Sequence, residues 1–331
     1  MKKFITSIIK FSSIAVVPLI LLIIGYIKLD PFRVIYNYSN YSYPYVTPNR
    51  DFISTEMFIK NKNIYNSFIF GSSRTLAFRP STWKQYLSVY DKPFMFDASA
   101  ESIYGIYTKL LYLDSQKNRI SNVLIIICRD YSFENHKNHK GHLYIKHPLT
   151  SNENKIVFHY NFIRAYLSPH FLLSFYDFEL TKQYKDWMEG FIVNKRTSYD
   201  TITNEMKLLD QQQEIEKNPT DYYLKRKEMF YERQAEKTDS VARIKEEHLF
   251  MLKEIKRILV KNKTNYKVII SPLYEQTKLN KHDINILTSI FGLNLYDYSG
   301  KNNFTENKLN YYETSHYIPS VGDSILQMIY K

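Results

Sequence analysis

The sequence predicts an α/β protein with a doubly wound, mainly parallel five-stranded sheet, a helical insertion and one N-terminal transmembrane helix. Short apolar runs bounded by turn residues recur after residue 60. They are continuous rather than alternating, as in strands that are buried on both faces. Helical stretches lie between these runs, and strand–helix alternation is typical of a doubly wound sheet. A separate apolar stretch occupies the first 29 residues.

The N-terminal stretch is typical of a signal anchor. Its apolar core, Phe11 to Leu29, is long enough to cross ~30 Å of hydrocarbon as a helix. Three lysines precede this core and keep the N-terminus on the cytoplasmic side: Lys2, Lys3 and Lys10. No small-x-small cleavage site follows, because the chain continues as Lys28–Pro31. We therefore expect residues 1–29 to be a cytoplasmic tip and an uncleaved single-pass anchor in a bacterial inner membrane, with the rest periplasmic.

Residues 30–60 are rich in Tyr, Asn, Ser and Pro, which favours an extended stem. The α/β domain is then expected over 61–331. Its predicted strands are Ser67–Phe70, Phe94–Phe96, Val123–Cys128, Lys267–Ile270 and Leu293–Tyr296. Its predicted helices include Ser102–Lys117, Val241–Val260 and Val321–Tyr330. The stretch from about 135 to 240 breaks this rhythm, and we interpret it as a mostly helical insertion that covers the site or binds a partner.

Composition narrows the class of function. The chain has 8 glycines in 331 residues, which argues against a glycine-rich nucleotide cradle. Its one cysteine, Cys128, excludes an internal disulfide and a multi-cysteine zinc site, and it lies in an apolar run where a buried side chain is expected. The net charge of +12 suits anionic partners, but no nucleic-acid motif accompanies it. The 30 tyrosines fit either a general compositional bias or carbohydrate-binding platforms.

Two motifs carry residues that are suited to nucleophilic catalysis. The first predicted strand ends in Gly71-Ser72-Ser73-Arg74, and a serine in a turn just after a strand is exposed as a nucleophile would be. The alternative is that the serine only caps the next helix. Near the C-terminus, Glu313-Thr-Ser-His316 places a carboxylate where it could orient an imidazole that acts as general base. Here the alternative is a surface glutamate beside a packed histidine.

Taken together, four blocks resemble the SGNH (GDSL-like) hydrolase superfamily: Phe70–Arg74, Phe96–Ser102, Ile127–Asp130 and Glu313–His316. They are most similar to the membrane-anchored branch that includes the D-alanine transfer protein of teichoic acid and the alginate O-acetylation proteins. The resemblance covers about 64–330 without the insertion and implies an SGNH/flavodoxin-like sheet. By position it implies Ser73 as nucleophile, with Ser72 as fallback, His316 as base and Glu313 in place of the usual aspartate. It also implies that the Ser73 amide donates to the oxyanion.

The chain departs from this family pattern in the two middle blocks. The second normally supplies a glycine amide but here reads Ala-Glu101-Ser102, and the third normally supplies an asparagine but here reads Cys-Arg129-Asp130. Arg129 could replace that donor, fill the pocket or pair with Asp130. The candidates for the oxyanion site or the pocket are therefore Ser72, Arg74, Glu101, Ser102, Arg129 and Asp130. The loss of one oxyanion donor costs about 3 kcal/mol, so a binding-only relative stays an alternative.

A histidine-rich stretch follows the third predicted strand and contains His136, His139, His142 and His147. Such a stretch could bind zinc, but it lacks a helical i, i+4 pair and is interrupted by a glycine and a proline. We therefore predict no metal and no cofactor. His142 and His147 are instead candidates for lining the cleft.

These observations support three hypotheses. The first is a membrane-tethered serine esterase or O-acyltransferase that acts on an acylated envelope polysaccharide or related polymer through an acyl-enzyme on Ser73. The resemblance further implies a multi-spanning membrane O-acyltransferase as partner. The second is a catalytically degenerate protein that binds glycan or that partner. The third is a tethered scaffold whose insertion is the working part.

Overall fold

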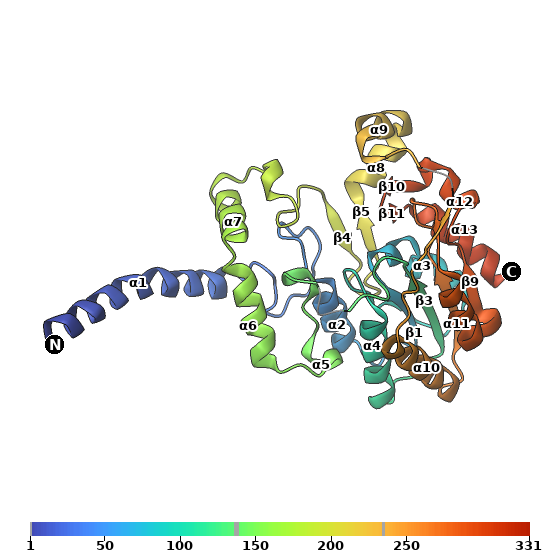
Figure 1. Cartoon of the computed structure of the whole chain (residues 1–331), viewed down its shortest axis with the longest axis horizontal. Coiled ribbons are helices and arrows are strands. Elements are labelled where there is room, and N and C mark those ends of the chain that lie inside the picture. The colour runs from blue at the N-terminus through green and yellow to red at the C-terminus, as the bar shows by residue number, and fades with distance from the viewer. Residues whose placement is uncertain (1, 136–138, 234–235) are drawn as a thin grey trace.

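The computed structural model describes residues 2–135, 139–233 and 236–331. Five parallel strands form the central sheet in the order β2-β1-β3-β7-β9 (Figure 1). Counted along the chain this order is 2-1-3-4-5, which is the flavodoxin-like arrangement. All five predicted runs are strands of this sheet: β1 (Ser67–Gly71), β2 (Pro93–Met95), β3 (Asn122–Ile127), β7 (Asn265–Ile270) and β9 (Leu295–Asp297).

Helices cover both faces of the sheet, which explains why the strands are apolar throughout. Successive side chains of a strand point to opposite faces, so Ile125 of β3 belongs to one core and Leu124 and Ile126 to the other. The helices over the first core are α2 (Arg50–Lys60), α4 (Ile103–Ser115), α10 (Glu246–Lys261) and α11 (Lys281–Phe291). Those over the second are α3 (Pro80–Trp83) and α13 (Pro319–Tyr330).

One predicted helix begins later than expected. We predicted a start at Val241, but α10 begins at Glu246. The amides of Arg243 and Ile244 instead donate to the carboxylate of Asp283 at 2.7 and 3.1 Å, which holds this segment outside the helix. A distant acceptor therefore decides this boundary.

The end of the expected stem is also different in the structure. Residues 50–60 form α2, and Ile53, Met57 and Phe58 are buried in the main core. The side chain of Asn49 caps this helix by accepting from the amide of Phe52 at 2.9 Å. The extended stem therefore does not continue to residue 60, and the folded region begins before residue 61.

The insertion is mostly helical, as predicted, and also contains an unexpected antiparallel hairpin, β4–β5. Its elements are η4 (His142–Tyr144), α5 (Pro148–Ser151), α6 (Lys155–Tyr166), α7 (Pro169–Thr181), η5 (Asp186–Met188), β4 (Thr197–Tyr199), β5 (Met206–Leu208), α8 (Leu209–Lys217) and α9 (Pro219–Lys225). Further elements are β6 (Lys237–Thr238), which pairs with β8 (Thr277–Lys278), and α12 (Asn303–Glu306).

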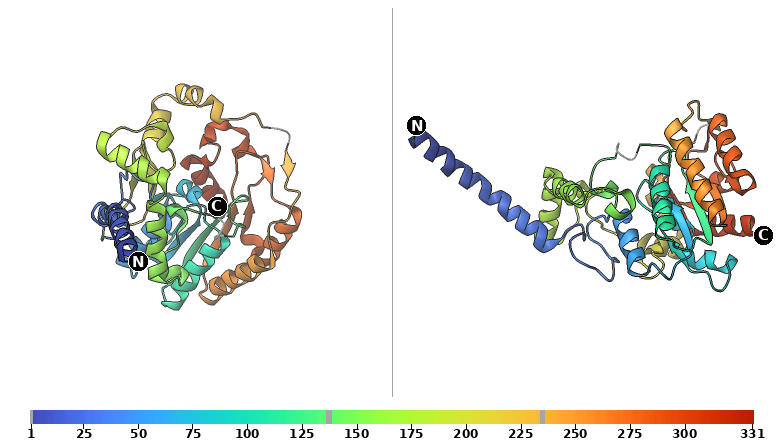
Figure 2. Two further views of the ribbon diagram at one scale, coloured as in Figure 1. Left: turned by 60° about the vertical axis from the view of Figure 1, so that its left-hand side comes forward. Right: turned by 90° about the horizontal axis from the view of Figure 1, so that it is seen from below.

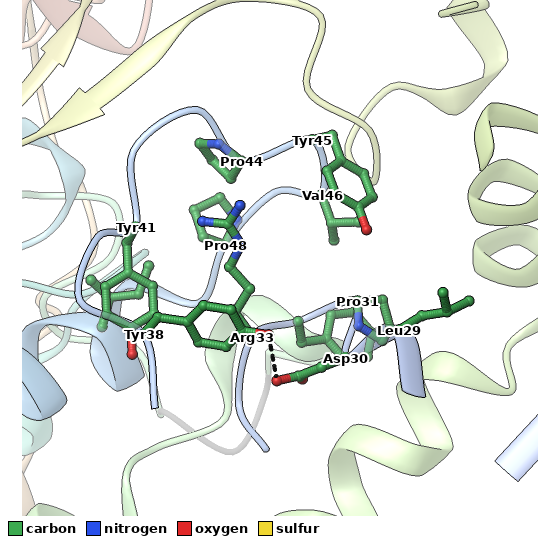
Figure 3. Close-up of a pocket in the computed structure, with 12 residues that line it drawn as sticks. Leu29, Asp30, Pro31, Arg33, Tyr38, Tyr41, Pro44, Tyr45, Val46 and Pro48 are labelled. Atoms are coloured by element: carbon green, nitrogen blue, oxygen red, sulfur yellow. Dashed lines mark hydrogen bonds between the residues drawn. The ribbon is translucent and has the colours of Figure 1, made fainter. Parts of the chain in front are cut away.

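Part of the insertion packs with residues 26–52 around a separate core, which we call the aromatic lobe. Its buried side chains are Tyr26, Phe32, Val34, Val46, Phe52, Phe158, Phe162, Tyr166, Phe171, Phe175, Met188 and Ile192. A cavity of about 220 Å³ lies in this lobe, beside the turn at Asp30, and Figure 3 shows residues that line it. The hydroxyl of Tyr38 donates to the Asp30 carboxylate there at 3.0 Å.

Helix α1 (Lys2–Leu29) contains the predicted anchor and projects from the aromatic lobe, away from the sheet (Figures 1 and 2). Within the part of the chain that the structure describes, no helix combines the length and the apolar character that a membrane span requires. Anchoring by residues 1–29 therefore stays a prediction from the sequence.

Candidate functional site

The first half of the site is the turn at the carboxyl end of β1. Gly71 has φ +151°, and a Cβ there would lie 2.8 Å from the carbonyl oxygen of Ile126 in the neighbouring strand β3, so this close approach requires glycine. Ser72 then caps η1 (Ser73–Ala77) through a 3.5 Å contact from the Arg74 amide to its Oγ. Ser73 is thereby the first residue of η1, and its side chain is partly exposed.

The second half is a hairpin, β10 (Tyr311–Glu313) with β11 (His316–Tyr317). A two-residue turn places Glu313 directly opposite His316. The Glu313 carboxylate is hydrogen-bonded to Nδ1 of His316 and accepts from the Ser315 amide at 2.6 Å. One carboxylate oxygen is thus held by the Ser315 amide and the other by the His316 ring, which fixes the orientation of the Glu313 side chain.

Ser73 and His316, 243 residues apart, meet at a distance of 2.7 Å between Oγ and Nε2. An ionised carboxylate only accepts, so the proton of the neutral imidazole lies on Nδ1 and Nε2 is free to accept from the serine hydroxyl. Burial alone would raise the pKa of Glu313, but the hydrogen bond and charge of His316 outweigh it and lower that pKa below its usual range. Glu313 is thus ionised at neutral pH, and the trio is arranged for general-base activation of Ser73.

Arg74 joins the two halves to a third element. Its Nη1 and Nη2 donate to the two oxygens of Asp130 at 2.9 and 2.7 Å, and its Nε donates to the carbonyl of Ser315 at 2.9 Å. The guanidinium also lies 5.4 Å from the ring centre of Tyr131. Since Asp130 follows β3 and Ser73 follows β1, the site occupies the point where strand order reverses, which is where such sheets bind ligands.

Helix α13 fixes the hairpin against the serine turn. It begins two residues after β11, and a Cβ on its Gly322 would lie 2.0 Å from the carbonyl oxygen of Ala77 in η1. Only glycine allows the two backbones to approach so closely. The sequence pattern gave no reason to single out Gly322, because its partner is remote in the chain.

Ser72, the fallback nucleophile, is buried, and its Oγ lies 3.3 Å from the sulfur of Cys128. Cys128 is itself buried, as predicted. Its sulfur is also 3.5 Å from the hydroxyl of Ser271. The Ser72 hydroxyl therefore faces the interior, and the geometry favours Ser73.

The two candidates from the second block, Glu101 and Ser102, have buried side chains. Glu101 is fully buried and pairs with Lys109 at 2.8 Å and with Lys146 at 2.5 Å. Ser102 is buried at the start of α4, and its Oγ has no hydrogen-bond partner among the described residues. The Glu101 and Ser102 side chains are therefore not placed to line the pocket. The Lys109 and Lys146 ammonium groups hold Glu101 in a buried ion cluster instead.

Arg129 does not pair with Asp130, which was one of the three roles expected for it. Its guanidinium pairs with Asp239 and Glu275, each at 3.0 Å, and Asp130 pairs with Arg74 instead. The Ser73 amide stands at the first position of η1, where an N–H has no acceptor inside the helix, so it is free to donate to an oxyanion.

The two histidines expected to line the cleft belong to the aromatic lobe. Nε2 of His142 donates to the carbonyl of Thr47 at 2.7 Å, and the ring stacks on Phe32. Nε2 of His147 contacts the carboxylate of Glu56 at 3.0 Å. Both side chains are buried there, so the expectation that they line the catalytic cleft is wrong.

The structure describes three of the four members of the histidine-rich stretch. Of its four members, His136 lies outside the described residues. His139 pairs with Glu134 at 3.0 Å. Among the described residues, no three His, Cys, Asp or Glu side chains are grouped so that they could hold a metal ion.

No family model matches the chain, and no curated protein matches it.

Proposed function

We propose that this chain is a membrane-tethered serine esterase or O-acyltransferase that acts on an acylated envelope polysaccharide or related polymer. The observation that carries the proposal is the hydrogen-bonded series Ser73–His316–Glu313 at the carboxyl edge of the sheet. The motifs that resemble the SGNH superfamily support the same assignment.

The proposed reaction has two steps. Ser73 Oγ attacks the carbonyl carbon of an acyl ester while His316 takes its proton, and the Ser73 amide donates to the oxyanion. Collapse of this intermediate breaks the ester bond, and His316 returns the proton to the leaving alcohol. Water or a sugar hydroxyl then attacks the acyl-enzyme while His316 takes its proton. The bond between the acyl group and Ser73 Oγ breaks, and His316 returns the proton to Oγ, giving hydrolysis or acyl transfer. Glu313 stabilises the imidazolium in both steps.

The proposed location follows from the sequence. With residues 1–29 as anchor and its lysines in the cytoplasm, the domain lies on the periplasmic side, near envelope polymers. A multi-spanning membrane O-acyltransferase that delivers acyl groups is the proposed partner. No role for nucleic acid is proposed.

A fluorophosphonate probe tests the catalytic proposal on the full chain in detergent micelles. We expect the wild-type chain to be labelled and Ser73→Ala not to be labelled. Ser72→Ala is the matched control, because this hydroxyl is adjacent in sequence but faces the interior. It should retain labelling.

The alternative is the binding-only protein, and the missing oxyanion donors favour it. Arg129, the side chain that could replace the missing asparagine, is held in ion pairs with Asp239 and Glu275. If the folded wild-type chain fails to react with the probe yet retains an envelope glycan in a pull-down that His316→Ala abolishes, the esterase proposal is refuted and the binding protein is supported.

A further inference from the structure

Helix α6 is apolar on two opposite sides. Phe158, Phe162 and Tyr166 form its buried side in the core of the aromatic lobe. Ile156 and Tyr160 each lie two positions before a buried residue, which is about 200° around a helix, and both are exposed. A helix that only covers a core would be polar on this outer side.

Helix α7 and the turn after it repeat this pattern. Phe171 and Phe175 are buried, whereas Leu173 and Leu180 point away from that core and are exposed. Trp187 follows in η5. We call the five exposed side chains the outer face; between 44% and 85% of each is exposed: Ile156, Tyr160, Leu173, Leu180 and Trp187.

Helices α6 and α7, which carry most of the outer face, belong to the lobe from which α1 projects (Figures 1 and 2). The joint between them is fixed. The Asp30 carboxylate accepts from the amides of Val34 and Ile35 just after α1 ends, and the Tyr166 hydroxyl donates to the Leu22 carbonyl at 3.0 Å. Tyr26 of α1 also packs its ring on Tyr166. The direction of α1 relative to α6 is thereby set by packing.

Exposed apolar side chains continue from the lobe along α1, including Val17, Leu21 and Ile24. Exposed apolar side chains are therefore found both on the predicted span and on the lobe that it joins. Tyrosine and tryptophan are the side chains enriched at membrane–water interfaces. Tyr160 and Trp187 supply them on the outer face.

We propose that the outer face lies in the interfacial layer of the bilayer that α1 enters, so that the aromatic lobe rests on the membrane as well as being tethered to it. This inference rests on the anchoring in the proposed function. Residues 155–188 carry four basic and three acidic side chains. Two of the basic ones, Lys182 and Lys185, are already paired with Glu179 and Asp177. Apolar burial rather than attraction to anionic lipid therefore drives the contact.

Such seating would orient the rest of the molecule. The lobe lies between α1 and the sheet in Figure 1, so the Ser73–His316 pair would be held beyond the lobe at a fixed height above the bilayer. The site would then reach polymer outside the headgroup layer rather than lipid within it.

Tryptophan fluorescence provides the test because the chain has only two tryptophans and Trp83 is fully buried in the domain core. The full chain is reconstituted into phosphatidylcholine vesicles with and without bromine on the lipid chains near the headgroup. We expect the brominated lipid to quench wild-type emission and to leave Trp187→Phe unquenched. The quenching should be the same at low and high salt.

Leu173→Glu/Leu180→Glu is the disrupting variant, and Leu293→Glu is its matched control. Leu293 is 96% exposed on η7 (Gly292–Asn294), beside the sheet. Glutamates on the outer face should abolish the quenching, whereas the control should keep it. Quenching that persists in the double variant overturns the inference. Wild-type Trp187 that is not quenched also overturns it, and this is the result expected if a second protein covers the outer face.

Carbonate extraction and probe labelling separate this inference from the proposed function. If carbonate releases the wild-type chain from vesicles, the anchoring itself has failed and the inference falls with it. If the chain stays integral and Ser73 is labelled but Trp187 is not quenched, the interfacial seating alone is wrong.

Discussion

Replacing Arg74 by methionine tests whether one guanidinium holds the two halves of the site together. The change keeps a long apolar stem but removes two charge-assisted hydrogen bonds to Asp130 and one bond to the Ser315 carbonyl. Breaking a buried ion pair costs about 3–5 kcal/mol. Because the Asp130 side chain is 29% exposed, water can solvate part of the stranded charge, so we expect a loss of about 2–4 kcal/mol in unfolding free energy.

The effect on the site should exceed the effect on the fold. Ser315 directly precedes His316, so the loss of its donor loosens the backbone that carries the base. A misplacement of about 1 Å costs on the order of 10²-fold in rate, and we expect fluorophosphonate labelling of folded Arg74→Met to slow by about that factor. Urea unfolding in micelles gives the unfolding free energy. The labelling rate of Ser73 is measured at urea concentrations far below the unfolding midpoint, where the variant is folded.

Two further variants apportion the effect. Arg74→Lys keeps the charge but lacks the planar fork, so its labelling rate should lie between those of the wild type and Arg74→Met. The double-mutant cycle with Asp130→Asn should give a coupling of about 1–3 kcal/mol. Arg74→Met that labels at the wild-type rate and unfolds within 1 kcal/mol of the wild type would refute the reasoning.

Three other outcomes follow from the geometry. Glu313→Gln should slow labelling of Ser73 by about 10³–10⁴-fold, because an amide can donate to the imidazole and so favours the wrong tautomer; a loss under tenfold contradicts this role. Burial lowers the pKa of His142 to about 4 from the usual 6.5, so its stabilisation is complete above pH 6.5 and is lost as the pH falls toward 4, by on the order of 3 kcal/mol. In His142→Gln, the unfolding free energy measured with urea should vary less with pH between 4 and 6.5 than in the wild type. An unchanged slope of that free energy against pH contradicts this role of His142. Gly322→Ala should destabilise by about 2–3 kcal/mol because its Cβ would strike the Ala77 carbonyl, whereas helix propensity alone predicts a gain, so the sign of the measured change decides.

Local pattern sufficed for the sheet. Continuous β-branched runs such as Val123–Cys128 mark strands buried on both faces, and all five runs pair in parallel. It failed where a remote group competes for the backbone, as at Arg243, whose amide bonds Asp283 rather than joining α10. The local pattern also missed the helix over residues 50–60, because the polar residues before it favoured a stem. The apolar residues at its i, i+4 and i+5 positions, which form its buried side, are Ile53, Met57 and Phe58.

The sequence by itself determined where the five strands lie along the chain and which two motifs, around Ser73 and His316, carry the candidate catalytic residues. Both follow from burial periodicity and turn chemistry, which are properties of neighbouring residues. Only the tertiary structure decided which charges meet. Arg74 binds Asp130 and Ser315, 56 and 241 residues away, while Arg129 binds Asp239 and Glu275. Ion pairing depends on distances and burial that exist only after the chain is packed, so no spacing along the chain could assign those partners.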